Sequence, residues 1–445
     1  MNFNEIKELL FAKAKQAGLS EYDVYFRMTS DASAEALNRE PSASTFGTKG
    51  GVCFRCAVNG RIGSAASQSL ESEALEALVS RAVANAAIID ADEEPIFFEG
   101  SGADAYQSVS CEVKELPDAA TLRQAVMDLQ EQLYAASPLM TDGTTTAAGA
   151  ATTEVSIANS KGLCLSHKAG MRYTYAEAIV NDGKEPSFGT AFAPTVATDT
   201  DIAAKATAEA LARLGAGACK TGSYDVIFSA KEVRALLSAF SGIFSGKNAL
   251  LGLSLLAGKE GQAVAAPCLT VIDDPFYPEN TMQMPFDAEG VATKEKKLIE
   301  NGVLKTLLYD LTYAKKAGKQ PTGNAARGIA DPVSISPYCL RIAPGDMTED
   351  ALLAKMGNGI YINELKGLHA GADAVTGDFS IESAGFLVEN GKRTRPIHSF
   401  TVAGNFFALL KAVDGVANNV EMGLPAVSGT AAPAVLVRGL SVAGE

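Results

Sequence analysis

Residues 285–311 read PFDAEGVATKEKKLIENGVLKTLLYDL, and the dipeptide Asn301-Gly302 divides two apolar runs within this stretch. Asn-Gly favours the two-residue turn of a β-hairpin, because both residues accept the positive φ angles that the turn requires. The dipeptide recurs at Asn59-Gly60 and at Asn390-Gly391, again between strand-like residues. Hairpins, rather than regular βαβ repeats, are therefore expected to organise the whole chain.

Segments with helical spacing of apolar residues surround these hairpins. The expected helices are 4–18 with Asn4 as its cap, 71–89, 118–136, 200–214, 231–244 and two short ones near Leu353 and Phe407. The expected strands include 22–28, 51–65 around its turn, 152–158, 163–180 and 224–228. This order predicts an α+β fold, with N-terminal helices on an antiparallel sheet and a strand-rich C-terminal α+β domain built from hairpins.

The length of 445 residues exceeds what one ordinary hydrophobic core supports. Gly215, Gly217 and Gly222 interrupt the alanine-rich helix and open a linker. The sequence therefore predicts two domains, residues 1–220 and 221–445.

Charge and composition exclude several classes of protein. The net charge of −14 is spread along the chain and opposes binding to a phosphate backbone, so no nucleic-acid partner is expected. The first helix carries Glu5 and Glu8 where an export signal needs cations, and no apolar run approaches a membrane span. Seven scattered cysteines without such a signal indicate reduced thiols in a cytoplasmic protein.

Few residues suggest chemistry on their own. Cys53 and Cys56 have redox-motif spacing, but within a strand they point to opposite faces. Asp273-Asp274 reads as a solvated turn, and the basic run Lys294–Lys297 as the solvated start of a hairpin strand. Asp287 and Glu289 form either a carboxylate pair or a turn. The segment Gly242–Asn248 fails the spacing of a phosphate loop.

The chain has three histidines, at positions 167, 369 and 398. His369 stands out because it lies in a glycine-rich connection just before Thr376-Gly377-Asp378, where a loop could expose an imidazole beside a carboxylate. His167 and His398 lie in expected strands and are interpreted as structural.

Ordered segments along most of the chain resemble the TldD/PmbA family. They include the quoted stretch, TGNAAR at 322–327, GLHAGADAVTGDFSIESAGFLVENG at 367–391, TVAGN at 401–405, VANNVE at 416–421 and LVRGLSVAG at 436–444. Where metallopeptidase members of that family carry His-Glu-x-x-x-His on a helix, this chain reads LLSAFS at 236–241. No cysteine follows Cys339 to supply the third zinc ligand that the resemblance implies.

The resemblance is closest to the PmbA/TldE branch, whose members lack the metal-binding motif. It implies a non-catalytic subunit of a cytoplasmic TldD/TldE-type protease that acts on unfolded or extended peptides, with zinc held only by a TldD-type partner. Peptides would add as strands to exposed sheet edges. The candidate peptide-binding residues are His369, Asp378, Ser383 and Asn405, with no catalytic or metal-binding residue expected.

Two alternatives remain open. One is a self-sufficient, metal-independent peptidase that uses His369 with Asp378 or Glu389. The other is a stand-alone peptide-binding module. An apolar surface made for a partner subunit also predicts a homodimer when that partner is absent.

Overall fold

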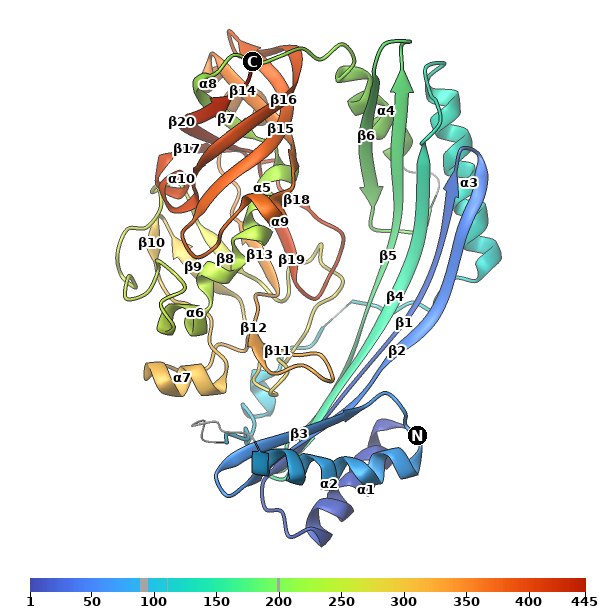
Figure 1. Cartoon of the computed structure of the whole chain (residues 1–445), viewed down its shortest axis with the longest axis vertical. Helices are drawn as coiled ribbons and strands as arrows, with labels where there is room; N and C mark the ends of the chain where they lie inside the picture. Colours follow the sequence, from blue (N-terminus) through green and yellow to red (C-terminus); the bar gives the residue numbers. More distant parts are fainter. Residues whose placement is uncertain (89–94, 110, 198–200) are drawn as a thin grey trace.

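The computed structural model describes residues 1–88, 95–109, 111–197 and 201–445. Figure 1 shows two bodies side by side: a long, curved N-terminal sheet with helices, and a strand-rich C-terminal part. This arrangement confirms the predicted α+β class. The domain boundary near residue 220 stays a prediction. No helix in the described ranges is both long and apolar enough to cross a membrane.

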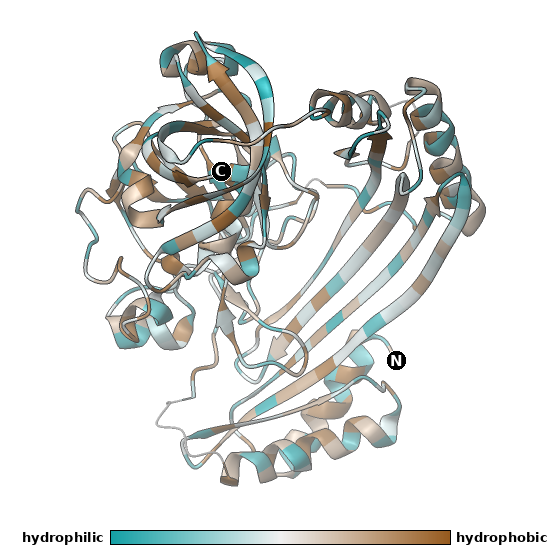
Figure 2. Cartoon of the chain, turned by 45° about the horizontal axis from the view of Figure 1, so that its top comes forward, coloured by the Kyte–Doolittle hydropathy of each residue, from teal (hydrophilic) through white to brown (hydrophobic). Residues whose placement is uncertain are grey.

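The N-terminal sheet is antiparallel throughout, in the order β3-β2-β1-β4-β5-β6. Its strands are β1 Tyr22–Leu37, β2 Glu40–Val58, β3 Arg61–Ser67, β4 Thr145–Asn159, β5 Cys164–Asn181 and β6 Pro186–Ala193. The predicted turn is confirmed, with φ of 50° at Asn59 and 76° at Gly60. Hydropathy varies along these strands (Figure 2), and buried residues alternate with less buried ones in the second half of β5, whereas Glu40–Lys49 of β2 are exposed.

Four longer helices pack on this sheet: α1 Phe3–Gln16, α2 Ser72–Ile88, α3 Ala119–Ala136 and α4 Ile202–Ala212. Helices α1 and α2 cover the β2–β3 end, whereas α4 covers β5 and β6. The first helix begins two residues earlier than predicted, because Asn2 and not Asn4 caps it. The Asn2 side chain accepts the Glu5 N–H, and the Glu5 carboxylate accepts the Asn2 N–H. Residues 89 and 200 of two predicted helices lie outside the described ranges.

The C-terminal part contains two larger sheets. Their orders are β10-β9-β8-β13-β19-β18 and β16-β15-β14-β7-β20-β17, and an additional β16–β20 pairing closes the second into a small barrel. The strands are β7 Gly222–Phe228, β8 Val271–Asp273, β9 Lys296–Glu300, β10 Val303–Leu304, β11 Ala325–Ala326, β12 Ser334–Ile335, β13 Cys339–Ile342, β14 Gly359–Lys366, β15 Asp378–Glu389, β16 Lys392–Asn405, β17 Val413–Val416, β18 Glu421–Met422, β19 Gly429–Ala432 and β20 Val435–Ala443.

Short helices connect these strands: α5 Ala230–Ala239, α6 Gly246–Leu250, α7 Leu311–Ala317, α8 Glu349–Met356, α9 Leu368–Gly371 and α10 Phe406–Ala412. The predicted helices near Leu353 and Phe407 are thus confirmed as α8 and α10. Both remaining Asn-Gly turns are confirmed too, between β9 and β10 and between β15 and β16. The fold therefore follows the hairpins that the sequence indicates.

The two bodies meet at a buried cluster around Asp23 on β1. Arg55 on β2 donates to the Asp23 carboxylate with its Nε at 3.0 Å, and Arg327 from the C-terminal part approaches it with Nη2 at 3.5 Å. The Arg327 guanidinium also lies 4.3 Å from the centre of the Tyr25 ring. All three charged side chains are buried, so this cluster joins the C-terminal part to the base of the sheet.

The two cysteines of the Cys53/Cys56 pair pack on opposite faces of β2, as predicted. Cys53 belongs to the cluster that includes Tyr25 and Met284, whereas Cys56 packs with Phe54 beneath the helices. Burial raises the pKa of Cys56 to about 11. All seven cysteines are free thiols.

The interpretation of Asp273-Asp274 as solvated is wrong, and that of Lys294–Lys297 is wrong for Lys296, whereas Lys294, Glu295 and Lys297 are exposed. Strands β8 and β9 pair antiparallel with Asp273 opposite Lys296, and both side chains are buried with Nζ 3.0 Å from Oδ2. Asp273 also accepts hydrogen bonds from Asn324 and from the Tyr338 N–H. Pairing of β8 with β9 brings the Asp273 carboxylate to the Lys296 ammonium, so the two opposite charges compensate each other inside the protein.

Replacing Asp273 by alanine should lower the free energy of unfolding by about 3–5 kcal/mol, because the buried Lys296 would lose its counter-charge. Urea denaturation measures the change. The matched control is Lys168→Ala, which breaks an exposed cross-strand pair with Glu154 and should cost less than about 1 kcal/mol. Equal losses in the two variants would show that the Asp273–Lys296 pair is not a buried structural contact.

Candidate functional site

Helix α5 occupies the place where the sequence reads LLSAFS. Ser229 caps the helix by accepting the Glu232 N–H, and a 3-10 turn at Ser241–Phe244 follows its end. The predicted helix 231–244 is confirmed in position, although it divides into these two pieces. Its two faces differ in chemistry, and each meets a different part of the molecule.

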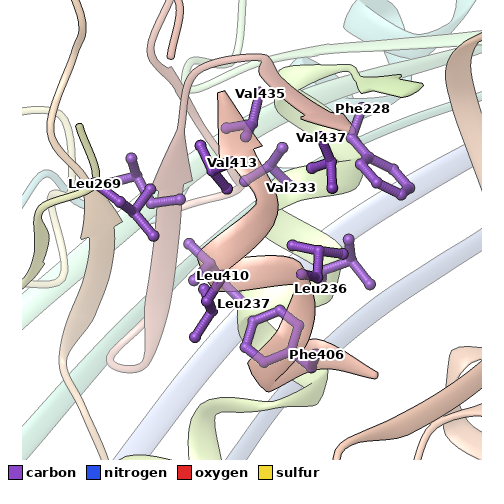
Figure 3. Close-up of a pocket in the computed structure, with 12 residues that line it drawn as sticks. Phe228, Val233, Leu236, Leu237, Leu269, Phe406, Leu410, Val413, Val435 and Val437 are labelled. Carbon is purple, nitrogen blue, oxygen red and sulfur yellow. The ribbon is translucent and has the colours of Figure 1, made fainter. Parts of the chain in front are cut away.

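The inner face of α5 is wholly apolar. Val233, Leu236 and Leu237 point into a small cavity, which Figure 3 shows together with Phe406 from α10. The cavity measures about 20 Å³, so it has room for little more than one water molecule. Just beyond it, the rings of Phe240 and Phe406 stack with centroids 4.3 Å apart and planes 5° apart. This face serves packing.

The outer face of α5 contacts the edge of the N-terminal sheet. Lys231 Nζ donates to Thr190 Oγ1 on β6 at 3.2 Å, and the Arg234 guanidinium lies 6.0 Å from the centre of the Phe192 ring on the same strand. The Arg234 Nε is buried without a hydrogen-bond partner. Strand β6 pairs only with β5 among the described residues, so no strand covers its second edge, although the Thr190 N–H there donates to Glu209 at 2.9 Å.

Glu232 is the one acidic residue of α5, and it is buried. Burial raises its pKa to about 7, although Lys231 and Arg213, as well as the Leu365 N–H that its carboxylate accepts, act in the opposite direction. A carboxyl group with a pKa near neutrality changes its proton occupancy under ordinary conditions. The protonation state of the Glu232 carboxyl group, which lies at the boundary between the two bodies, therefore depends on pH in this range.

Arg213 at the end of α4 makes a second bridge between them. Its guanidinium donates to Glu364 on β14 at 2.7 Å, to Glu209 at 2.7 Å and to the Asn363 carbonyl at 3.0 Å. It also lies 4.9 Å from the centre of the Phe188 ring on β6. Together with the contacts of α5, this bridge holds β6 next to the C-terminal barrel.

Comparison with known proteins identifies the family. Residues 221–444, half of the chain, match the sequence profile of the PmbA/TldA metallopeptidase C-terminal domain, and residues 22–86 match domain 1 of the same group. A crystal structure of a Thermotoga maritima protein described as a modulator of DNA gyrase superposes with a TM-score of 0.89. It is 30% identical and covers 99% of this chain and 100% of that one. The chain belongs to the PmbA/TldD family.

Other relatives indicate the branch. A metalloprotease PmbA homolog from Haemophilus influenzae is 26% identical over 424 residues, which cover 92% of this chain and 89% of that protein. A metalloprotease from Methanothermobacter thermautotrophicus is 29% identical over 60% of each chain, so that alignment spans less than two thirds of the relative. TldE from Thermococcus kodakarensis shares the fold, with a TM-score of 0.88 at 22% identity. The protein is a PmbA/TldE-like member of the family.

The residues of this family member do not fit a metal at α5. Leu236, Leu237 and Phe240 are buried in the apolar core, and the Ser241 hydroxyl donates to the Ser238 carbonyl at 2.9 Å. Zinc sites in proteins use imidazole, thiolate or carboxylate ligands. Within the described ranges, no group of three or more His, Cys, Asp or Glu residues is placed to hold a metal ion.

The predicted peptide-binding residues of this PmbA/TldE-like chain are only partly brought together. Asp378 and Asn405 pair across β15 and β16, and Asn405 Nδ2 donates to Asp378 Oδ1 at 2.8 Å. Asn405 also caps α10 through its side-chain oxygen. Ser383 is buried and donates to the Ile381 carbonyl at 3.0 Å. Three of the four thus have structural contacts, and their peptide-binding role stays a prediction.

The histidines lie on three separate elements. His369 is exposed on α9, close to the start of β15, whereas Glu389 lies at the opposite end of that strand from Asp378. His167 on β5 shares a 2.9 Å hydrogen bond with the Gln283 carbonyl, and burial lowers its pKa. His398 lies on β16. The structure therefore does not place Glu389 beside Asp378 and His369.

Asp287 and Glu289 are buried, and their carboxylates accept both local and long-range hydrogen bonds. Asp287 accepts the N–H groups of Glu289, Val291 and Ala325, and Glu289 accepts that of Leu311. Burial raises the pKa of Asp287 to about 6 and that of Glu289 to about 7. Turn formation accounts for the bonds from the Glu289 and Val291 N–H groups. The bonds from Ala325 and Leu311 come from residues 38 and 22 positions away, so they connect the turn to β11 and α7.

Sequence reasoning missed Glu232 and Arg234. A signal was available, since Ser229-Ala230-Lys231-Glu232 matches the Ser-x-x-Glu pattern of a helix start. That pattern predicts an exposed capping carboxylate. The structure instead turns the Glu232 side chain to the Leu365 N–H on β14, and this contact depends on a strand more than a hundred residues away.

Glu232→Gln should change how stability depends on pH. Between the ordinary pKa of 4.5 and the folded value of about 7, folded wild-type protein holds a proton that the unfolded chain releases. Wild-type stability therefore falls as pH rises through this window, and the variant lacks this contribution. Relative to wild type, the variant should gain up to about 3 kcal/mol between pH 4.5 and pH 8.

Denaturation midpoints across this pH range test the expectation. Glu382→Gln, which removes an exposed carboxylate on β15, is the control and should leave the pH profile of wild type unchanged. A constant difference between Glu232→Gln and wild type at all pH values would contradict the assignment of the titration to Glu232.

Proposed function

We propose that this chain is the non-catalytic subunit of a cytoplasmic TldD/TldE-type metalloprotease and that it pairs with a TldD-type chain that holds the zinc. The observation that carries the proposal is the apolar face of α5. Leu236 and Leu237, at the place of the family's metal-binding motif, are packed into the core beside Phe406. Because these side chains pack in the core, we infer that α5 has a structural role in the protease and does not bind the metal.

The rest of the chain supports the same role. Its three histidines lie on β5, α9 and β16, so they do not form the paired imidazoles of a zinc peptidase. The shared fold with a TldE protein is consistent with a partner subunit. The seven free cysteines and the family assignment favour a cytoplasmic location.

The second edge of β6, which no strand covers among the described residues, is a suitable place for an extended peptide that would displace the bond from the Thr190 N–H to Glu209. It lies beside Lys231 and Arg234 of α5, while Phe188 and Phe192 on the strand offer apolar contacts. A peptide that adds as a strand uses backbone hydrogen bonds and therefore tolerates varied sequences. We infer that this edge, rather than the surface around Asp378, contributes to the substrate chamber.

Mixing experiments test the proposed function. The isolated chain should contain no stoichiometric zinc and should not cleave an unfolded peptide such as casein. Addition of a TldD-type chain from the same organism should give activity above the sum of the two separate proteins, with zinc only in the TldD-type chain. Metal analysis and a fluorescent peptide assay measure these quantities. One equivalent of zinc in the isolated chain would contradict the proposal.

His369→Ala separates this proposal from a self-sufficient peptidase. In the mixture, the variant should support the same activity as wild type, because His369 is exposed on α9. Helix α9 lies next to α5, but the contacts of α5 with β6 are made by Lys231 and Arg234. Chelator-resistant cleavage by the isolated chain that disappears in His369→Ala would establish the alternative. Binding of peptides without any association with a TldD-type chain would instead favour a stand-alone binding module.

A further inference from the structure

Four leucines are exposed within six residues on the C-terminal part. Leu250, Leu251, Leu253 and Leu255, here called the leucine segment, are between 42% and 56% exposed. They are four of the eleven large apolar residues that are exposed in the described ranges. A contiguous apolar cluster on a protein surface marks an interaction site, whereas single exposed residues do not.

The leucine segment is held in place from beneath. The Ser254 hydroxyl donates to the Ile243 carbonyl at 2.6 Å, and the Leu253 N–H donates to the Asn248 carbonyl at 2.7 Å. Leu256, the next residue along, is buried in the main core. The backbone is thus anchored while the four side chains point outward, so their exposure is a property of the folded chain.

Cations surround the leucine segment. Lys247 precedes it and Lys259 follows it, and α7, which packs against α6, carries Lys315 and Lys316. Lys247 and Lys316 lie 5.4 Å and 5.0 Å from the centre of the Tyr313 ring. The nearby Glu260 is paired with Lys319. An apolar centre with a basic rim has therefore formed on a chain whose net charge is −14.

This surface faces away from the N-terminal sheet. In Figures 1 and 2, α6 and α7 lie on the side of the C-terminal part opposite the curved strands, so the N-terminal body does not cover them. Among the described residues no other segment covers the four leucines, so the occupant that we consider is another molecule. Protein interfaces of this kind combine an apolar centre with a charged rim that selects the partner.

We propose that the leucine segment and its basic rim are the docking surface for the metal-bearing partner subunit, which meets it with an apolar patch edged by carboxylates. Charge decides between this occupant and a second copy of the chain. A symmetric dimer through this surface would place one lysine rim against the other, which is unfavourable. The proposal rests on the proposed function, because it names the surface through which that partner binds.

A double substitution, Leu251→Asp with Leu253→Asp, tests the surface. It should weaken binding to a TldD-type chain from the same organism at least ten-fold in calorimetry, because carboxylates would enter the apolar centre. The fold should be unaffected, since both side chains are exposed. Phe46→Asp is the matched control, because Phe46 is an exposed apolar residue on β2 of the N-terminal sheet, and it should bind as wild type does. Thermal unfolding confirms that all variants are folded.

Charge reversal at the rim provides an independent arm. Lys247→Glu with Lys259→Glu should weaken binding several-fold at low ionic strength, and added salt should reduce the difference from wild type. Lys205→Glu, an exposed charge on α4, is the control for the change in net charge.

The outcomes are distinguishable. Failure of wild-type protein to bind any TldD-type chain would overturn both the proposed function and this inference. Wild-type binding that the double aspartate variant retains within two-fold would overturn the docking surface and leave the proposed function intact. Loss of self-association with retained binding to the TldD-type chain would show that the occupant is a second copy.

Discussion

The arrangement of the two bodies depends on one buried carboxylate. Asp23, on the first strand of the sheet, holds Arg55 from its own body and Arg327 from the other. Burial alone would raise the pKa of Asp23, but the two guanidinium groups lower it below its ordinary value. Removal of one partner from such a cluster leaves an uncompensated charge in a medium of low dielectric constant, which is strongly unfavourable. The cluster therefore fixes the orientation of the C-terminal part at the base of the sheet.

With the C-terminal part in that orientation, helix α5 lies between the core of the barrel and the N-terminal sheet. Its inner face completes the core of the barrel region, and its outer face reaches the edge of β6 through Lys231 and Arg234. Arg213 supports the same boundary from the opposite side by binding Glu364. Under the proposed function, this geometry would supply walls of a substrate chamber, while Leu236 and Leu237 stand where the family resemblance places metal ligands. This is the physical content of the proposed partner role.

Much of the fold could be predicted from local sequence signals. The predictions that were wrong or incomplete all concern contacts between segments that are distant in the sequence. All three Asn-Gly hairpins were predicted because the turn chemistry lies within two residues. Strands β1 and β2 extend far beyond the predicted segments, because residues 29–50 are rich in Ser, Thr, Gly and Ala and show little apolar alternation. The extended part of β1 pairs with β2 on one side and with β4 on the other, and this pairing stabilises it. Asp273 and Lys296 were taken for solvated charges, since only the β8–β9 pairing shows that they meet.

The sequence by itself determined the class of fold, the positions of the hairpins and the absence of histidine, cysteine and carboxylate side chains at 236–241. These properties depend on residue types and short spacings, and no distant contact can restore an absent imidazole. Only the tertiary structure decided which charged groups are buried, that Asp378 and Asn405 pair with each other, and that Glu232 meets β14. Only it placed four leucines on the surface within a ring of lysines. Such properties depend on which distant segments pack together, because burial and charge compensation are set by neighbours in space.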